Sequence, residues 1–180
     1  MTDEQLGFKE NTDAFVQRTL EQDVPGLLPY LHPGARILDV GCGSGSITLD
    51  VAAEVSPGAV VGVDVMEERI ANAAKLAADR GMKNVSFEVS DAHDLRFPDN
   101  TYDVVYSHTV LHSLIDPLRA ISEQKRVARP GGWVSASGVR DFGFSPRDPA
   151  CPALDGLHAA WVRYHELLHK RYLSGAKVPG

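Results

Sequence analysis

The sequence reads Arg36-Ile-Leu-Asp-Val-Gly-Cys-Gly-Ser-Gly45 at the point that decides its fold, followed by Ser46-Ile-Thr-Leu-Asp-Val-Ala-Ala-Glu-Val55. Its first part, Ile37 to Val40, is a short apolar run typical of a buried strand. Glycines at alternate positions then allow a tight turn and the close approach of a ligand: Gly41, Gly43 and Gly45. The second part has a helical pattern. Strand, glycine loop and helix in this order predict free N–H groups at a helix N-terminus, where open α/β sheets bind nucleotides.

The composition is that of an ordinary globular domain, with 180 residues, 43% of them hydrophobic and 23% charged. A formal net charge of −6 gives no general attraction for phosphate backbones, so we expect no nucleic-acid substrate. No apolar run reaches the length of a membrane span and the N-terminus does not resemble a signal peptide, so we expect no membrane partner. Two cysteines, Cys42 and Cys151, make no disulfide framework, which favours a cytoplasmic location.

Strand and helix patterns alternate along the chain. Strands are expected at residues 37–40, 59–63, 85–89, 102–106 and 133–139, and helices at 46–55, 67–80 and 117–129. Two short helices, separated at Pro25-Gly26, are expected before the first strand. Asp116-Pro117 is typical of a helix N-terminus, and Pro130-Gly-Gly132 of a tight turn. The pattern predicts an α/β, Rossmann-like three-layer sandwich with a mainly parallel sheet.

Two aspartates follow the ends of predicted strands. Asp64 lies nineteen residues past Gly45, where a carboxylate can accept hydrogen bonds from both hydroxyls of a ribose. The alternative is that Asp64 caps the helix that begins near Glu67. Asp91 follows the 85–89 strand in the same way, and its alternative is a cap or a solvated loop residue.

These features occur in the order of one enzyme family. The segment 39–45 resembles motif I of the class I S-adenosylmethionine-dependent methyltransferases, in which the third glycine comes one residue earlier than in the G-x-G-x-x-G of dinucleotide enzymes. Later motifs extend the resemblance over about residues 36–139: Val63-Asp64, Ser90-Asp91-Ala92, Tyr102-Asp-Val-Val-Tyr106 and Pro130-Gly-Gly132. The chain looks like the ubiquinone-biosynthesis-type branch, which methylates small molecules.

The resemblance implies S-adenosylmethionine as the cofactor. It assigns to Asp91 a hydrogen bond from the adenine amino group, and to a main-chain carbonyl at Ser107-His108 the methionine ammonium. Arg18 matches a position that can approach the methionine carboxylate, with solvent exposure as the alternative. The predicted cofactor-binding residues are Asp39, Gly41, Cys42, Gly43, Asp64, Val65, Asp91, Ala92 and Ser107.

Methyl transfer requires little of the protein beyond alignment and the exclusion of water, because the sulfonium already activates the methyl group. An acceptor O–H or N–H group also needs a base. His108 and His112 follow the fourth strand at the expected acceptor side and are the predicted catalytic residues, with packing as the alternative. Asp141 is a weaker candidate.

The segment His165-Glu-Leu-Leu-His169 matches the zinc motif H-E-x-x-H. It lies in a predicted amphipathic helix from Leu154 to Leu173, and no third ligand follows at a recognisable spacing. We therefore expect a packed and solvated helix face and no metal.

The domain organisation is expected to be a single domain over residues 1–180: an N-terminal helical cap (1–34), a cofactor-binding core (35–140) and a loop with a C-terminal helix (141–180). The family adds two antiparallel strands after the fifth strand, but the 41 residues that follow Val139 show no alternating pattern. We expect these strands to be missing, and the uncovered sheet edge then favours a homodimer.

The sequence thus predicts a methyltransferase that acts on a small organic acceptor. Two alternatives remain. One is a module that binds S-adenosylmethionine without turnover, because of the short C-terminus. The other is an NAD-dependent oxidoreductase, which the glycine spacing disfavours.

Overall fold

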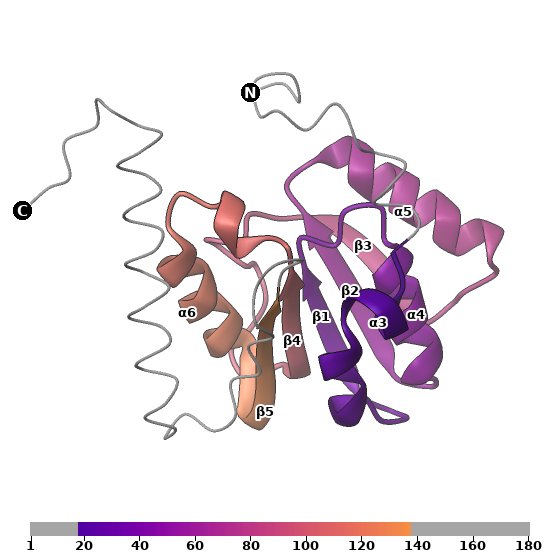
Figure 1. The fold of residues 1–180 in the computed structure, drawn as a ribbon, viewed down its shortest axis with the longest axis horizontal. Helices are drawn as coiled ribbons and strands as arrows, with labels where there is room; N and C mark the ends of the chain where they lie inside the picture. Colours follow the sequence, from indigo (N-terminus) through magenta and orange to yellow (C-terminus); the bar gives the residue numbers. More distant parts are fainter. Residues whose placement is uncertain (1–17, 138–180) are drawn as a thin grey trace, which may run out of the picture. The chain divides into compact units, whose positions relative to one another are not determined.

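The computed structural model describes residues 18–137 (Figure 1), which contain one five-stranded sheet in the order β3-β2-β1-β4-β5. All neighbouring strands are parallel. The strands are β1 (Arg36–Val40), β2 (Ala59–Asp64), β3 (Val85–Val89), β4 (Tyr102–His108) and β5 (Ala128–Ser137). The predicted Rossmann-like sandwich with a parallel sheet is confirmed. The predicted loss of the C-terminal antiparallel strands concerns residues outside the described range.

Helices connect the strands as expected. They are α3 (Leu20–Asp23), η1 (Pro25–Tyr30), α4 (Ser46–Glu54), α5 (Glu67–Asp79), η2 (Leu111–Ser113) and α6 (Pro117–Val127). Helices α4 and α5 contact β2 and β3, whereas α6 contacts β4 and β5. The break between the two short N-terminal helices lies at Val24, one residue before the predicted Pro25-Gly26, because Pro25 already begins η1. The predicted start of α6 is also confirmed, because the Asp116 carboxylate accepts a hydrogen bond from the Arg119 N–H at 3.0 Å.

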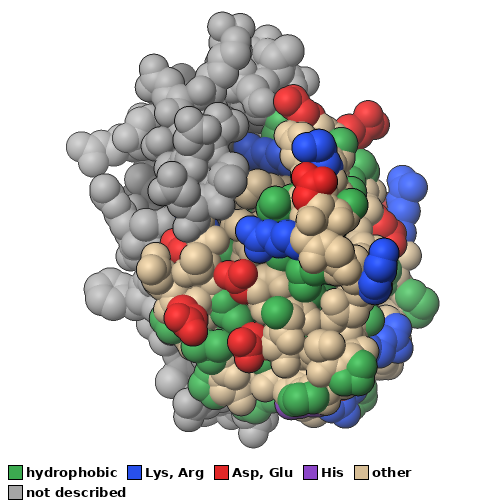
Figure 2. Space-filling view, turned by 90° about the vertical axis from the view of Figure 1, so that its right-hand side faces the viewer, with side chains coloured by type: hydrophobic (Ala, Val, Ile, Leu, Met, Phe, Trp, Pro, Cys, Tyr) green, Lys and Arg blue, Asp and Glu red, His purple; other side chains and the backbone are tan. Residues whose placement is uncertain are grey.

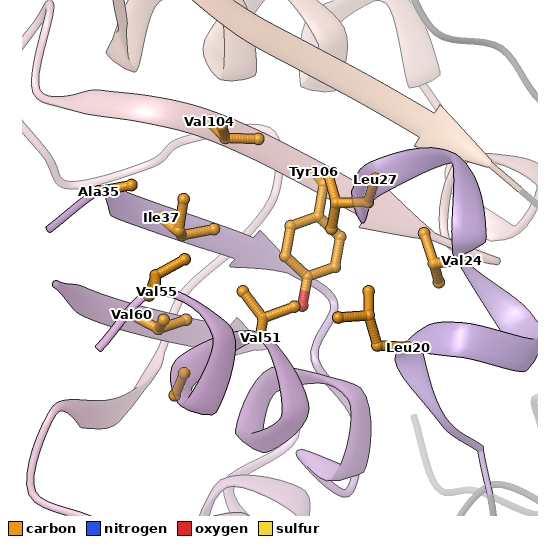
Figure 3. Close-up of a cluster of buried hydrophobic side chains, with 11 residues drawn as sticks. Leu20, Val24, Leu27, Ala35, Ile37, Val51, Val55, Val60, Val104 and Tyr106 are labelled. Atoms are coloured by element: carbon orange, nitrogen blue, oxygen red, sulfur yellow. The ribbon is translucent and has the colours of Figure 1, made fainter. Parts of the chain in front are cut away.

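Alternate residues of the central strands enter two separate core clusters. Ile37 of β1 packs with aliphatic side chains of α3, η1 and α4, and Leu38 packs with Val127 of α6. Figure 3 shows the first cluster, in which the ring of Tyr106 lies among Leu20, Val24, Leu27 and Val51. Asp39 points to the same face as Ile37 and pairs across the sheet with Tyr106 of β4 and with Gly62 of β2. This register places a carboxylate at the end of an otherwise apolar layer.

The predicted turn at Pro130-Gly-Gly132 is wrong in its placement. Strand β5 already begins at Ala128, and its register with β4 is interrupted, since Tyr102 pairs with Ala128 and Val104 pairs with Trp133. The extra residues form an irregularity within the strand. Gly131 lies inside it with φ +74°. The pair Gly131-Gly132 therefore predicts a turn when the sequence is considered locally, whereas pairing with β4 includes these residues in the sheet.

Arg126 connects α6 to the segment between β3 and β4. Its Nη1 donates to the Phe97 carbonyl at 2.8 Å and its Nη2 to the Leu95 carbonyl at 2.6 Å. The same guanidinium contacts the carboxylates of Glu123 and Asp99 at 2.8 and 2.7 Å. The segment that it holds begins just after Asp91, so Arg126 supports one side of the strand tips.

We expect Arg126→Ala to lower the free energy of unfolding by about 1–3 kcal/mol, because two carbonyls and two carboxylates lose a charged donor. Urea denaturation monitored by circular dichroism measures the difference. Lys75→Ala is the control, since Lys75 forms only an exposed ion pair with Asp79 and its loss should change the value by less than about 0.5 kcal/mol. Equal changes in the free energy of unfolding for Arg126→Ala and Lys75→Ala would show that the contacts of Arg126 do not stabilise the fold.

No helix within residues 18–137 has the length and apolarity needed to cross a membrane. On the face shown in Figure 2, Lys and Arg side chains lie among Asp and Glu side chains.

Candidate functional site

The N–H groups of the glycine loop are occupied by the protein itself. Gly41 and Cys42 donate to the Val63 carbonyl at 2.7 and 2.9 Å, and Gly45 donates to the Cys42 carbonyl at 2.9 Å. Gly43 donates to the Asp64 carboxylate at 3.1 Å. The glycine loop therefore differs from the free N–H groups expected after the first strand, because the N–H groups of these four residues have partners within the protein. A diphosphate needs several unpaired N–H groups, so the loop does not suit a dinucleotide.

Gly41 also allows the segment after β4 to close over the loop. Its φ is +79°, and a Cβ at this position would overlap the side chain of Val110. Both the backbone conformation and the space require glycine here. The loop after β1 and the segment after β4 therefore meet at the carboxyl edge of the sheet.

Asp39 is buried beneath the loop, with 3% of its surface exposed. The Thr48 hydroxyl of α4 and the Tyr106 hydroxyl of β4 both donate to its Oδ2, each at 2.6 Å. Burial, with a smaller contribution from the nearby Asp64 carboxylate, nevertheless raises the pKa of Asp39 to about 6. No residue of the described range forms an ion pair with Asp39. A buried negative charge without a cation is unfavourable, and a bound cation would relieve it.

Asp64 ties β2 to the glycine loop. One carboxylate oxygen accepts from the Gly43 N–H at 3.1 Å and the other from the Met66 N–H at 3.0 Å, and Arg69 lies 3.8 Å away. The N-cap of α5 is Met66, without a side-chain bond, so the alternative of Asp64 as the cap of this helix is wrong. Each oxygen keeps a second lone pair for a further donor.

The two carboxylates give the loop a negative field. Burial raises the pKa of the Cys42 thiol well above its ordinary value, and the charges of Asp39 and Asp64 raise it further. The thiol is therefore protonated and unreactive at neutral pH. A field of this sign favours a cationic ligand and disfavours a diphosphate.

A hollow lies beside Asp64, at the tips of β2 and β3. It has a volume of about 290 Å³ and is lined by Val65, Val89, Ser90, Asp91, Asp94 and Arg96. Val65 and Val89 are 68% and 48% exposed, so two apolar side chains of the lining are accessible to a ligand. The hydroxyl of Ser90 is buried and has no hydrogen-bond partner in the described part of the chain. Apolar walls with unsatisfied polar atoms suit a flat heterocycle.

Asp91 lies at the edge of this hollow, but its neighbour His93 was not identified from the sequence. Asp91 Oδ1 accepts a hydrogen bond from the His93 N–H at 2.8 Å and lies 2.7 Å from His93 Nδ1. These bonds lower the pKa of Asp91, so its carboxylate is ionised at neutral pH. The local turn interpretation of Asp91 and a ligand role are thus compatible. Ala92 packs partly buried against the α6 side of the core.

The end of β4 holds His108 and a strained residue. His108 is 8% exposed, its Nδ1 lies 2.9 Å from Ser137 Oγ, and its Nε2 has no partner within residues 18–137. Burial, and then the charge of Arg18, lower the pKa of His108 to about 4, so the imidazole is neutral at pH 7. Thr109 has φ +58°, a costly conformation for this residue type. Its sequence gave no signal of this strain.

Arg18 reaches the same edge. Its Nη1 donates to Thr109 Oγ1 at 2.8 Å, and its Nε lies 3.9 Å from Asp23. Ser107 is buried, and its hydroxyl lies 3.4 Å from the Gln124 side chain of α6. His112 lies exposed in η2.

The remaining candidates lie outside the described residues: Asp141, Cys151 and the segment His165-Glu-Leu-Leu-His169. Within residues 18–137 no group of His, Cys, Asp and Glu side chains is arranged to hold a metal ion.

Residues 31–166 match the family model of the methyltransferase domain. The chain belongs to this methyltransferase family. The match covers the whole sheet and the strand tips described above, and S-adenosylmethionine is the cofactor of the class I members that share this fold.

Known methyltransferases align over the same region. An uncharacterized methyltransferase of Schizosaccharomyces pombe is 37% identical over 73% of this chain and 51% of its own length. A ubiquinone/menaquinone biosynthesis C-methyltransferase of Bdellovibrio bacteriovorus is 34% identical over 61% of this chain and 45% of its own. The crystal structure of a SAM-dependent methyltransferase from Aquifex aeolicus has a TM-score of 0.62 and 27% identity over 76% of this chain and 72% of its own. The chain spans about half the length of these two curated relatives.

The residues of this methyltransferase domain fit S-adenosylmethionine. The buried carboxylates at the glycine loop suit its positive groups, and the hollow with exposed valines suits its base. The absence of unpaired N–H groups at Gly41, Cys42, Gly43 and Gly45 matches a cofactor without phosphate.

Proposed function

We propose that this protein is an S-adenosylmethionine-dependent methyltransferase acting on a small organic acceptor. The observation that carries the proposal is the glycine loop, whose N–H groups are occupied while two buried carboxylates, Asp39 and Asp64, lie beside it. This arrangement favours a cation over a diphosphate. The family match and the ubiquinone/menaquinone biosynthesis C-methyltransferase among the relatives support the choice of reaction and of acceptor class.

The binding assignments extend the sequence predictions. Asp39 provides negative charge beneath the methionine part, and Asp64 accepts from the ribose with the lone pairs that Gly43 and Met66 leave. Val65 and Asp91 line the base site. Main-chain atoms complete the proposed contacts, and they belong to Gly41, Cys42, Gly43, Ala92 and Ser107.

The bound sulfonium supplies an activated methyl group, and the protein must orient an acceptor in line with it and exclude water. His108 lies at the end of β4 with a neutral imidazole at pH 7, and its Nε2 has no partner among residues 18–137, so it can accept a hydrogen bond from an acceptor O–H or N–H group. Because the pKa of His108 is lowered to about 4, this side chain orients a proton better than it removes one. His112, exposed in η2, is the second candidate.

The test combines binding and turnover. Calorimetry should show that S-adenosylhomocysteine binds and that NADH neither binds nor competes with it. Incubation with S-adenosylmethionine and a panel of phenols, amines and quinone precursors should yield S-adenosylhomocysteine together with a product heavier by one methyl group.

Two outcomes favour other functions. Binding of S-adenosylhomocysteine without product from any acceptor would favour a cofactor-binding module, and tight NADH binding with no effect of S-adenosylhomocysteine would favour an oxidoreductase. A homodimer, the lack of a nucleic-acid partner and a cytoplasmic location stay predictions.

A further inference from the structure

Asp91 lines the hollow, and its two carboxylate oxygens differ in their hydrogen bonds. Its Oδ1 accepts from both the N–H and Nδ1 of His93, at 2.8 and 2.7 Å. Its Oδ2 makes no hydrogen bond with any described residue, and 58% of the side chain is exposed. Because an ionised carboxylate only accepts hydrogen bonds, His93 must supply the proton from Nδ1.

His93 is itself fixed in place. Only 19% of its side chain is exposed, and its Nε2 is buried without a partner in the described range. The turn that carries both residues is closed by the Asp94 N–H, which donates to the Asp91 carbonyl at 3.0 Å. The backbone N–H and the ring of His93 both contact Oδ1, and together they restrain the orientation of the Asp91 carboxylate.

We infer that His93 is a positioning residue that aims Asp91 Oδ2 at the hollow, so that the site selects a base carrying an exocyclic amine over one carrying a carbonyl. This inference rests on the proposed function, since it concerns the base of the same cofactor. The second oxygen of Asp91 accepts hydrogen bonds and donates none, so it pairs with the 6-amino group of adenine and repels the 6-oxo group of hypoxanthine. Nothing in the motif spacing of the chain assigns this role to position 93.

The experiment compares S-adenosylhomocysteine with S-inosylhomocysteine, which differs at the 6-position and at the protonation of N1. Calorimetry on the whole chain gives both dissociation constants for the unaltered protein and three variants. His93→Ala removes the ring, His93→Asn keeps an N–H donor near the position of Nδ1, and His32→Ala is the control, since His32 lies in an exposed turn. Thermal unfolding of each variant verifies that it is folded.

The unaltered protein should prefer S-adenosylhomocysteine by about tenfold or more. His93→Ala should weaken its binding by about fivefold to tenfold and that of S-inosylhomocysteine by less than about twofold, so that the preference falls. His93→Asn should restore most of the preference, and His32→Ala should leave it unchanged.

Equal weakening of both ligands in His93→Ala, or a preference that stays at its original value, would overturn the assignment while the proposed function stands. Failure of the unaltered protein to bind S-adenosylhomocysteine would overturn the proposed function, and the role of His93 with it. If His93→Ala does not fold, His93→Asn carries the test alone. A folded His93→Asn protein that no longer prefers S-adenosylhomocysteine would count against the inference.

Discussion

Asp39→Asn is expected to weaken S-adenosylmethionine binding at pH 7 by about tenfold or more and, at the same pH, to raise the free energy of unfolding. The amide keeps an oxygen that can accept from Thr48 and Tyr106, which both donate to Oδ2 in the structure. It loses the negative charge that we assign to the positive part of the cofactor. The substitution therefore separates the role of the charge from that of the hydrogen bonds.

The gain in stability follows from the pKa of Asp39. Burial raises this pKa from 3.8 to about 6, so the folded protein holds the proton more tightly than the unfolded chain does. The protonated Asp39 side chain therefore contributes its full share to the stability of the unaltered protein below pH 3.8, and this contribution is lost as the pH rises through 6. Above that, the ionised carboxylate costs the folded state about 3 kcal/mol, which Asp39→Asn avoids.

Urea denaturation between pH 4 and pH 8 tests this. The free energy of unfolding of Asp39→Asn should exceed that of the unaltered protein by an amount that grows from pH 4 to pH 6 and then stays constant. Tyr106→Phe is a companion variant. Because the Tyr106 hydroxyl lowers the pKa of Asp39, its loss should move the midpoint of that pH dependence upward.

Asp79→Asn is the control for charge, since Asp79 is an exposed acid on α5. It should change neither the affinity for S-adenosylmethionine nor the pH dependence. An Asp39→Asn variant that binds the cofactor as the unaltered protein does would show that the buried charge does not act on the ligand.

Asp64→Ala is expected to have the second large effect, a loss of cofactor affinity of about 1–3 kcal/mol. The structure adds a reason that the sequence did not contain. The carboxylate holds the glycine loop through the Gly43 N–H and the start of the next segment through the Met66 N–H. Its removal takes away the acceptor that we propose for the ribose and leaves the Gly43 and Met66 N–H groups without this partner.

Two measurements separate these contributions. Calorimetry with S-adenosylhomocysteine and with free homocysteine shows whether the loss depends on the nucleoside, as a ribose contact requires. The free energy of unfolding shows how much the loop loses by itself. Unchanged affinity for S-adenosylhomocysteine would remove Asp64 from the site.

Local patterns were sufficient to predict the strands and helices of the core. Apolar runs bounded by glycine or aspartate placed β1 and β2 to within a residue, because both faces of these inner strands are covered. Alternating apolar residues placed β3, an edge strand with exposed positions. The end of β4 and the start of β5 were less accurate. Each of those limits depends on pairing with the neighbouring strand, as the irregularity at Gly131 shows.

The sequence was sufficient to name candidate residues for the site but not their hydrogen bonds. Motif spacing brought Asp39, Asp64 and Asp91 to one edge, as the sheet order confirms. It could not show that the Val63 carbonyl occupies the N–H groups of Gly41 and Cys42, because that contact joins two strands. For the same reason it missed Tyr106 as a donor to Asp39.

The most direct measurement is a crystal structure of this protein with S-adenosylhomocysteine. We predict that the ribose hydroxyls lie within hydrogen-bond distance of Asp64, that the base lies between Val65 and Val89, and that the amino-acid part lies over Gly41 to Gly45. A ligand bound away from the tips of β1, β2 and β3, or a ligand whose ribose does not reach Asp64, would contradict the account.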